Sequence, residues 1–525
     1  MLFENQLLYF ALKIVLLTVP FIDAARILAV FPTPSISHQV VFRPLTQELA
    51  KRGHEVVVIT TDPAFPKGKA PKNLTEIDVH DLSYTIWKEK FLAMATGKKD
   101  DLYTQMEVAL ELFSTIFELQ MQTDEVKAVL SDRKTTFDLL IVEACVRPTL
   151  ALSHVYKVPL IQASSLGPIF GTYEIIGAPT HPILYPTFIA QKLNNLSYAD
   201  KISEIYKYFS VQHLLTIRDK ADDVMLKRLF GPDMPTMSEL INNVDMVFLN
   251  IHSVWEGNYP VPPSVIYMGG LHQKPQKELP KDIKTLLDSS KNGVIYMSFG
   301  TNTDPSALPK ERMQIFYKVL SQLPYDVLWK WNNDDVPGQA KNIRFSKWFP
   351  QSDLLRHPKV KLFITQGGLQ STDETITAGV PVIGIPMLGD QWFNVEKYVK
   401  YKIGVRLDLD TITEDTLREA IQKVIGDESY RRNIRRLKVL MADQPQGSLE
   451  RVVWWTEHTL RHGGARHLRA PAHNMGWSEY LMLDILVPFL IVLIAVTVLG
   501  LLVVVRLARW IVHSYSIGNV KHKVH

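Results

Sequence analysis

The sequence predicts an α/β protein built from two doubly wound halves that face a cleft, followed by a C-terminal transmembrane helix. Short apolar runs alternate with helical stretches from Arg26 onward, and the same alternation restarts after about residue 290. An uncharged apolar run then extends from Ile485 to Val505. At 525 residues, 46% of them hydrophobic, the chain has enough apolar material for two cores of ordinary size.

The expected strands are almost unbroken apolar runs, which is typical of parallel strands that helices cover on both faces. They are Arg26–Phe31, Glu55–Thr60, Phe137–Val142 and Val158–Gln162 in the first half, and Val294–Ser298, Val327–Trp331, Lys361–Thr365 and Val382–Ile385 in the second. Helices are expected from about His38 to Arg52, where Gly53 stops the pattern, and over Glu311–Leu323. Because ligands of such sheets bind at the carboxyl ends of the strands, we expect the functional site in the cleft.

Shifts in composition predict the divisions of the chain. The expected segments are a signal peptide at 1–24, a first α/β domain at 25–271, a linker rich in Lys, Pro and Gln at 272–291, a second α/β domain at 292–470, a juxtamembrane segment at 471–484, a transmembrane helix at 485–505 and a basic tail at 506–525.

The N-terminus has the order of a cleavable signal peptide. Lys13 precedes an apolar stretch from Ile14 to Ile22, and the small residues Ala24 and Ala25 follow. A buried first strand is the alternative interpretation of this stretch. We disfavour it because Arg26–Phe31 already supplies that strand.

The C-terminal run predicts a membrane anchor. As a helix, Ile485–Val505 would be about 30 Å long, which matches the hydrocarbon thickness of a bilayer. Trp477 and Trp510 flank it as interfacial anchors do, and Arg506 and Arg509 follow it. The positive-inside rule then puts the tail in the cytosol and the two domains in the lumen, as in a single-pass type I protein.

Two further short signals bear on the compartment. Lys521 and Lys523 lie at the fifth and third places from the end, as in the dilysine signal that returns membrane proteins to the endoplasmic reticulum. A solvated basic tail is the alternative. Asn73 and Asn195 each begin a glycosylation sequon, although the motif is short enough to occur by chance.

Cysteine content and charge exclude other classes. Cys145 is the only cysteine, so no intrachain disulfide can form. The net charge of +4 is mild, and the basic residues form no long face with interleaved aromatics. Nucleic acid is therefore not expected as a partner.

The most specific local pattern predicts an anion site in the second half. A strand ends at Thr365, the pair Gly367 and Gly368 turns the chain, and a helix begins near Gln370. Free backbone N–H groups at a helix start bind anions, and glycines let the backbone approach a phosphate closely. Pro386 and the pair Asp390–Gln391 follow at a fixed spacing, which makes the pattern stronger than two glycines alone.

These residues resemble the signature of the UDP-glycosyltransferases, glycosyltransferase family 1, and most closely that of its insect membrane-bound members. The matching segments are Phe363–Gln391, Trp348–Gln351 with His357 and Pro358, Ser37 with His38, Arg52–Val56, Ser298–Thr301, Gly269–His272 and Arg461–Ala465. The resemblance covers nearly the whole chain. It implies the GT-B fold, in which a Rossmann-like acceptor-binding domain faces a Rossmann-like domain that binds the UDP-sugar.

The resemblance also implies roles for the donor-binding residues. Trp348 would stack on uracil, and Gln351 and Glu374 would bond the nucleoside and its ribose. The set expected to hold the diphosphate or line the loops around it is Ser298, Gly300, Gln366, Gly367, Gly368, Gln370 and Ser371. Asp390 and Gln391 would hold the sugar hydroxyls. Most relatives have histidine where this chain has Gln366, which can donate a neutral hydrogen bond to phosphate but adds no charge.

The implied chemistry is transfer with inversion at the anomeric carbon. His38 would be the base that deprotonates the acceptor hydroxyl, since its ordinary pKa lies near the operating pH. Glu143 occupies the position where relatives commonly have the aspartate that orients this base, whereas Asp138 lies at the other end of the strand. No Asp-x-Asp metal motif is present, and enzymes of this type generally need no metal or cofactor beyond the UDP-sugar co-substrate.

The expected reaction moves a hexose, with glucose favoured, to small lipophilic acceptors such as phenols, plant toxins or steroids. Asn250 stands where glucuronate-using relatives often have arginine, which favours UDP-glucose. Aromatic and methionine residues that could line an acceptor pocket are Met94, Met106, Met121, Phe170, Tyr173, Phe188, Tyr206 and Phe209. Two alternatives stay open: a catalytically impaired member that binds ligands, and a glycosyltransferase for membrane lipids. A homo- or hetero-oligomer is also open.

Overall fold

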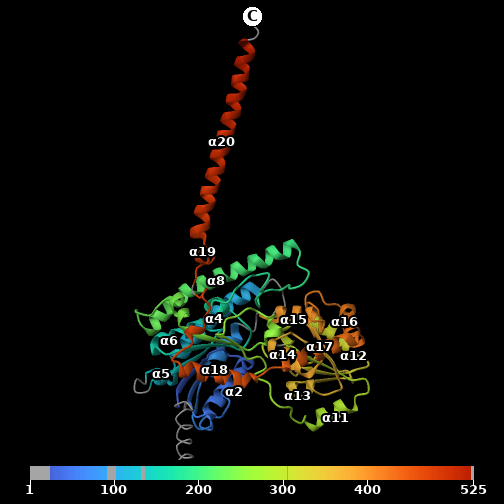
Figure 1. Ribbon diagram of the computed structural model, residues 1–525. Coiled ribbons are helices and arrows are strands. Elements are labelled where there is room, and N and C mark those ends of the chain that lie inside the picture. Colours follow the sequence, from blue (N-terminus) through green and yellow to red (C-terminus); the bar gives the residue numbers. More distant parts are fainter. Residues whose placement is uncertain are drawn as a thin grey trace, which may run out of the picture. The chain divides into compact units, whose positions relative to one another are not determined.

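The computed structural model describes residues 24–90, 102–131, 136–169, 171–303, 305–473 and 475–521. Its contacts divide the chain into two compact units, Met1–Ala470 and Pro471–His525. The first unit holds both sheets and the second holds the long C-terminal helix (Figure 1). The predicted α/β class and the transmembrane-type helix are confirmed.

The first sheet is parallel throughout, with the strand order β3-β2-β1-β4-β5-β6-β7. Its strands are β1 (Arg26–Phe31), β2 (Glu55–Thr60), β3 (Leu74–Asp78), β4 (Leu139–Glu143), β5 (Leu160–Ser164), β6 (Val244–Leu249) and β7 (Val265–Tyr267). The order reverses between β1 and β4, and such a switch point opens a crevice at the carboxyl ends of the strands. His38 follows β1 and Glu143 ends β4, so the topology brings both to this crevice.

The second sheet is also parallel, with the order β10-β9-β8-β11-β12-β13. Its strands are β8 (Val294–Ser298), β9 (Asp326–Lys330), β10 (Ile343–Ser346), β11 (Val360–Thr365), β12 (Val382–Gly384) and β13 (Gly404–Arg406). Here the switch point lies between β8 and β11. Ser298 ends one of these strands, and the glycine turn follows the other.

Helices cover both faces of each sheet and bury its apolar strands (Figure 1). In the first unit they are α2 (Ile36–Lys51), α3 (His80–Lys90), α4 (Leu102–Met121), α5 (Asp124–Ser131), α6 (Ala151–Tyr156), α7 (Thr172–Ile175), α8 (Tyr198–Phe230), α9 (Met237–Leu240), α10 (Ser253–Glu256), α11 (Lys281–Ser289), α12 (Lys310–Ser321), α13 (Gln351–Leu355), α14 (Leu369–Ala378), α15 (Gln391–Lys400), α16 (Glu414–Gly426), α17 (Glu428–Ala442) and α18 (Ser448–Arg461).

The expected second domain, 292–470, includes a helix that packs on the first sheet. The helix α18 returns to the first sheet, where Val452, Val453 and Ala465 belong to the same core cluster as Ile27. An ion pair of 3.2 Å between Arg52 Nη1 and Glu457 Oε1 ties the same helix to the end of α2. The second domain therefore ends before α18, because the apolar stripe of that helix is buried against the first sheet.

The expected linker at 272–291 also differs from the structure. Its second part is not an irregular connection, because residues Lys281–Ser289 form α11. Ile283 and Leu287 are buried one turn apart on this helix, and they pack it against the core. Charged residues dominate its exposed face, so the composition of this segment resembles that of a linker.

The second unit contains α19 (Trp477–Tyr480) and α20 (Leu483–Lys521). Within the described residues, α20 is the one helix long and apolar enough to cross a membrane, over Leu483–Tyr515, and none of that window is buried. It is longer than the predicted 485–505. The expected signal peptide at 1–24 lies outside the described residues except for its last residue, as does the end of the predicted dilysine signal.

Candidate active site

A cavity of about 450 Å³ lies between the carboxyl ends of the two sheets in the first unit. Its lining includes His38 and all of the predicted donor-binding residues except Gly367: Ser298, Gly300, Trp348, Gln351, Gln366, Gly368, Gln370, Ser371, Glu374, Asp390 and Gln391. Glu143 is not in the lining and lies fully buried behind His38. The structure thus gathers in one cavity residues that are far apart in the sequence.

His38 and Glu143 form a short hydrogen bond at the switch point of the first sheet. The distance between His38 Nδ1 and Glu143 Oε1 is 2.7 Å. Glu143 Oε2 accepts a hydrogen bond of 3.1 Å from the backbone N–H of Thr33. This second bond fixes the carboxylate, so the extra methylene of glutamate still reaches the ring. With Nδ1 donating to the carboxylate, a neutral imidazole keeps the lone pair of Nε2 for a proton.

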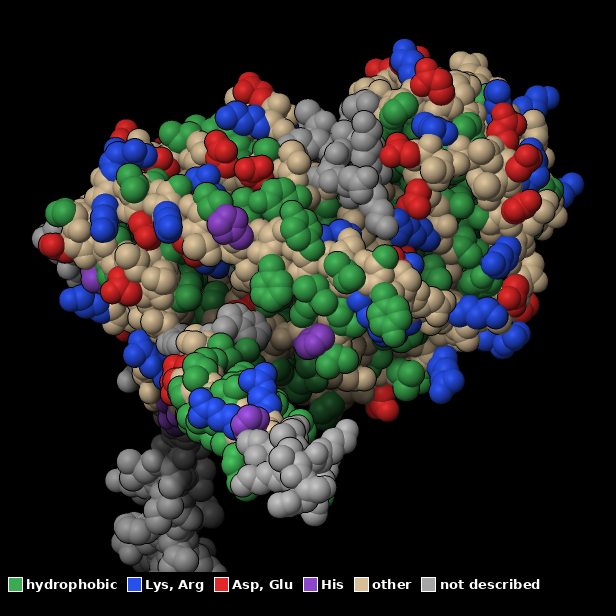
Figure 2. Space-filling view, turned by 90° about the horizontal axis from the view of Figure 1, so that it is seen from above, with side chains coloured by type: hydrophobic (Ala, Val, Ile, Leu, Met, Phe, Trp, Pro, Cys, Tyr) green, Lys and Arg blue, Asp and Glu red, His purple; other side chains and the backbone are tan. Residues whose placement is uncertain are grey.

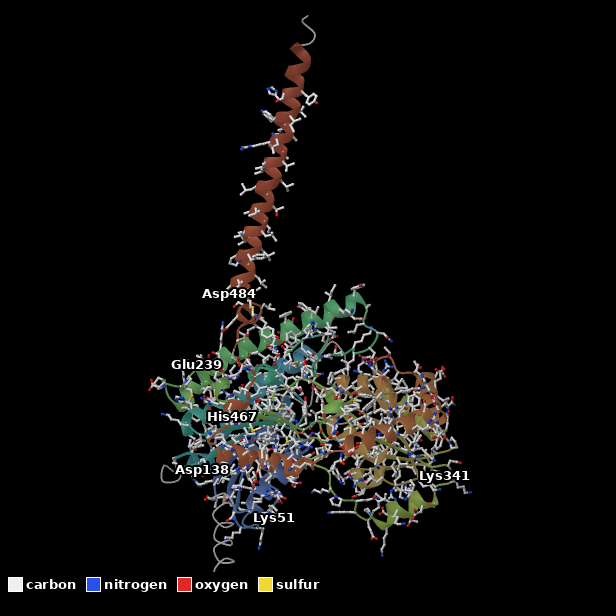
Figure 3. The ribbon with its side chains drawn as sticks, in the orientation of Figure 1. Lys51, Asp138, Glu239, Lys341, His467 and Asp484 are labelled. Atoms are coloured by element: carbon white, nitrogen blue, oxygen red, sulfur yellow. The ribbon has the colours of Figure 1, made fainter. Side chains whose placement is uncertain are left out.

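The positions of Asp138 and Cys145 bear on which groups can act with His38. Asp138 lies at the opposite end of β4 (labelled in Figure 3), where it accepts a hydrogen bond from Arg26 N at 2.7 Å. It therefore cannot orient His38. Cys145 Sγ lies 3.9 Å from His38 Nδ1, and burial raises the pKa of the thiol well above its usual value. Within the described residues, His38, Glu143 and Cys145 are the one group whose ligand atoms, all within 4.8 Å of one another, could hold a metal ion.

The glycine turn prepares the start of α14 for an anion. Gly367 has φ +89°, and a Cβ there would lie 2.5 Å from Val395 Cγ2, so only glycine fits the turn. Gly368 is the N-cap and has no side chain, while the N–H group of Leu369, the first helical residue, faces the Asp390 carboxylate. The N–H groups at the helix start and the helix dipole favour negative charge in the cavity.

The loop after β8 contacts this turn through a side-chain hydrogen bond. Gln366 Oε1 accepts a hydrogen bond of 2.9 Å from Thr303 Oγ1. Gly300 has φ +76°, and a Cβ at this position would collide with the Gln366 amide. The side chain of Gln366 therefore bridges the two loops, and its amide remains electrically neutral.

A hydrogen-bonded group lies at the other side of the α14 start. Gln351 Nε2 donates to Glu374 Oε2 at 2.7 Å and to Ser371 Oγ at 2.9 Å, while Gln351 Oε1 accepts from Tyr296 Oη at 3.0 Å. Burial raises the pKa of Glu374 above its usual value. The group offers a fixed carboxylate that can accept bonds from two neighbouring hydroxyls.

Lys330 is a site residue that the sequence analysis missed. Among the described residues that line the cavity, it is the only lysine or arginine. Its Nζ donates to Gly300 O at 2.6 Å and lies 5.1 Å from the centroid of the Trp348 ring, which is 65% exposed. Burial lowers its pKa. Its position as the last residue of β9, at the carboxyl edge of the sheet, was a signal that could have found it.

The carboxylate of Asp390 is held from both domains. Asn394 Nδ2 donates to Asp390 Oδ2 at 2.7 Å and to Gly367 O at 3.0 Å. Asn394 Oδ1 in turn accepts a bond of 3.2 Å from Trp255 Nε1 in the first domain. Burial raises the pKa of Asp390 to about 6. At neutral pH the group is therefore mostly ionised and accepts hydrogen bonds.

Two predicted donor residues have side chains that are partly engaged. Gln391 Oε1 accepts from the backbone N–H groups of Met387 and Leu388 at 2.8 and 2.9 Å. Gln370 Nε2 donates to Ser165 O of the first domain at 3.1 Å. Both residues still line the cavity, but only their remaining polar groups can face a ligand.

The predicted acceptor residues are divided by the structure. Met106 and Phe188 line the cavity. Met121 and Tyr173 are core residues, Phe209 is exposed, and Tyr206 lines a second cavity. Met94 and Phe170 lie outside the described residues. Asn250 is buried, donates to Ser165 O at 2.9 Å and does not line the cavity, so it does not face the donor sugar.

Comparisons with known proteins agree with this geometry. The family model "UDP-glucoronosyl and UDP-glucosyl transferase" matches residues 26–515. An ecdysteroid UDP-glucosyltransferase from Lymantria dispar multicapsid nuclear polyhedrosis virus is 37% identical over 89% of this chain and 93% of the relative. UDP-glucosyltransferase 2 of Dactylopius coccus is 30% identical over 99% of both chains, and human UDP-glucuronosyltransferase 2B7 is 30% identical over 88% and 89%.

Solved structures support the fold. The glycosyltransferase of kitacinnamycin superimposes with a TM-score of 0.57 at 17% identity, over 83% of this chain and 100% of that one. Spinosyn forosaminyltransferase gives 0.56 at 16% identity, over 83% and 99%. The two facing parallel-sheet domains thus have the GT-B arrangement of these glycosyltransferases.

Proposed function

The chain belongs to the UDP-glycosyltransferase family, and from this premise we propose that it transfers glucose from UDP-glucose to a hydroxyl of small lipophilic acceptors, with inversion. The observation that carries the proposal is that His38, held by Glu143, shares one cavity with the glycine turn and the start of α14. The choice of glucose is supported by the names of relatives such as the viral ecdysteroid UDP-glucosyltransferase.

In the proposed reaction, His38 Nε2 takes the proton from the acceptor hydroxyl as its oxygen attacks the anomeric carbon. The new bond from oxygen to carbon forms while the bond from the anomeric carbon to the UDP oxygen breaks, and UDP leaves with the electron pair. The proton ends on His38, and the adjacent Glu143 carboxylate stabilises the imidazolium.

The departing UDP is stabilised mainly by the protein backbone. The N–H groups at the start of α14 face its diphosphate, with the hydroxyls of Ser298 and Ser371 beside them. Lys330 adds the positive charge that Gln366 lacks. No metal ion is required in this scheme, because these groups already stabilise the negative charge of the phosphates.

The remaining contacts select the donor. Trp348 offers an exposed ring face for uracil, and Gln351 and Glu374 hold the nucleoside and its ribose hydroxyls. Asp390 and Gln391 take the sugar hydroxyls. Since the pKa of Asp390 is raised to about 6, sugar binding should weaken as the pH falls through that value.

We place the enzyme in the endoplasmic reticulum membrane, with both domains in the lumen. The apolar helix α20 and the basic residues in its C-terminal part support the anchor and its orientation. Asn73 and Asn195 are exposed and are the proposed glycosylation sites. Conjugation of xenobiotics or hormones would suit a membrane enzyme with apolar acceptors.

The test uses the full-length protein in microsomes with radiolabelled UDP-glucose and a panel of phenols and steroids. Wild-type protein should transfer label, and His38→Ala should lose about 10²–10⁴-fold in kcat while still binding UDP. UDP binding by the wild type without transfer to any acceptor would instead favour the ligand-binding alternative, which the neutral Gln366 keeps open. Parallel reactions with UDP-galactose and UDP-glucuronate decide the sugar.

A further inference from the structure

The main cavity leaves limited room for a long acceptor. It measures about 450 Å³ and is lined by residues assigned to the donor as well as by His38. Protein pockets that hold one drug-sized ligand usually measure about 300–1,000 Å³. A reaction that needs donor and acceptor together therefore fills this cavity with the UDP-sugar and the reacting end of the acceptor.

A second cavity of about 410 Å³ adjoins the first. The two share Leu102 and Met106 in their linings, so both reach the first turns of α4. The other walls of the second cavity come from Ile189 and from the α8 residues Tyr206 and Val211. Figure 2 looks onto the face to which α8 belongs and shows hydrophobic side chains gathered there.

The wall between the cavities is apolar and adaptable. Leu102 and Met106, which line both cavities, are buried in one hydrophobic cluster with Ile189 and Val211 of the second cavity, and Met106 is only 4% exposed. A methionine side chain is unbranched and flexible, so it can move aside for a ligand at little cost. Tyr206 lines the second cavity and is 73% exposed, which places the outer end of this cavity at the surface.

Resting on the proposed function, we propose that this second cavity is a subsite for the body of the acceptor. The reacting hydroxyl lies at His38, and the apolar remainder of the molecule passes Met106 and fills the space between α4 and α8. The ligand class is a phenol or alcohol with an apolar chain or fused-ring body longer than a single ring. Polar groups at the rim, where Lys207 Nζ donates to Gln191 Oε1 at 3.1 Å, tolerate a hydroxylated far end.

The test uses the full-length enzyme with a series of 4-alkylphenols, in which the reacting hydroxyl stays constant and only the tail grows. For the wild type, kcat/KM should rise by a factor of about two to four for each added methylene that is buried. Ser210→Trp places an indole in the second cavity from the half-buried side of α8. It should abolish the rise for long tails by about tenfold or more, and leave phenol itself and the KM for UDP-glucose within twofold.

Ser203→Trp is the control, because it makes the same change at an exposed position two turns earlier on the same helix, which does not line the cavity. It should leave the whole series unchanged. Met106→Ala should act in the opposite direction and favour bulky tails over phenol. A flat wild-type series, or an equal loss for phenol and long tails in Ser210→Trp, overturns the subsite. Failure of the wild type to glucosylate phenol at all would instead contradict the proposed function.

Discussion

The two domains hold their functional groups in different ways. In the first, a side-chain pair separated by 105 positions meets because β1 and β4 are neighbouring parallel strands, with Val30 paired to Val142. In the second, consecutive residues from Gln366 to Glu374 form a turn and a helix start, whose backbone N–H groups are the proposed diphosphate site. In the proposed reaction, the first domain accepts a proton on a pair of titratable groups, whereas the second binds the diphosphate anion mostly through neutral groups. Single substitutions should therefore cause large losses of activity in the first domain and smaller, graded losses in the second.

The largest effect outside His38 itself is expected at Glu143. In Glu143→Gln the new amide can donate to His38 Nδ1, which leaves the ring proton on Nε2 and removes the base. We expect kcat to fall by about 10²–10⁴-fold, with UDP binding unchanged. Asp138→Asn, at the other end of the same strand, is the matched control and should keep full activity. Similar losses in both variants would mean that the strand, and not the pair, was disturbed.

The next effect tests a side-chain network that the two domains share. Asn394→Ala removes the donor that lowers the pKa of Asp390, so that pKa should rise from about 6. The acid limb of kcat/KM for UDP-glucose then moves to higher pH, and the donor KM at neutral pH rises about tenfold, as expected for a hydrogen bond to a charged group. UDP lacks the transferred hexose, so its inhibition constant should not change.

A second variant separates positioning from folding. Trp255→Phe removes only the N–H that Asn394 accepts and keeps an aromatic ring in the interface. It should shift the same acid limb in the same direction by a smaller amount. A loss of thermal stability without any shift in the pH profile would show that this network holds the domains together and does not act on Asp390.

Lys330→Met tests whether a charge supports the backbone site. The substitution keeps the length of the side chain but removes the cation beside Gly300 and Trp348. UDP affinity should fall about tenfold, on the scale of one charge-assisted hydrogen bond. Lys347→Met is the control, because Lys347 is exposed and pairs with Asp334 instead. Equal UDP affinity in wild type and Lys330→Met would show that the α14 start stabilises the phosphate charge without help from Lys330.

The same contrast explains what the sequence could predict. The unbroken apolar runs predicted the bounds of β1, β2 and β8 correctly. The donor pattern could be recognised because its residues are consecutive in the sequence. The Glu143 position followed from the resemblance to relatives, which commonly have an aspartate just after this strand. Lys330 also ends a strand, but that strand was expected to continue to Trp331, and Lys330 belongs to no local motif. The return of α18 to the first sheet and the walls of the two cavities depend on contacts between distant segments, which a periodic pattern does not encode.

The smallest effect is expected at Gln366, where the bridging amide is neutral. Gln366→His should keep a hydrogen bond between the two loops and gain a positive charge when the ring is protonated, which requires a pH near or below about 6.5. The ratio of kcat in the variant to kcat in the wild type should therefore rise about two- to fivefold as the pH falls from 8 to 6.5, and approach one at pH 8. Because both proteins contain Asp390, its titration cancels in this ratio. A ratio below one at every pH would show that the fit of the glutamine between Thr303 and Gly300 matters more than added charge, and that the second domain works best with neutral groups.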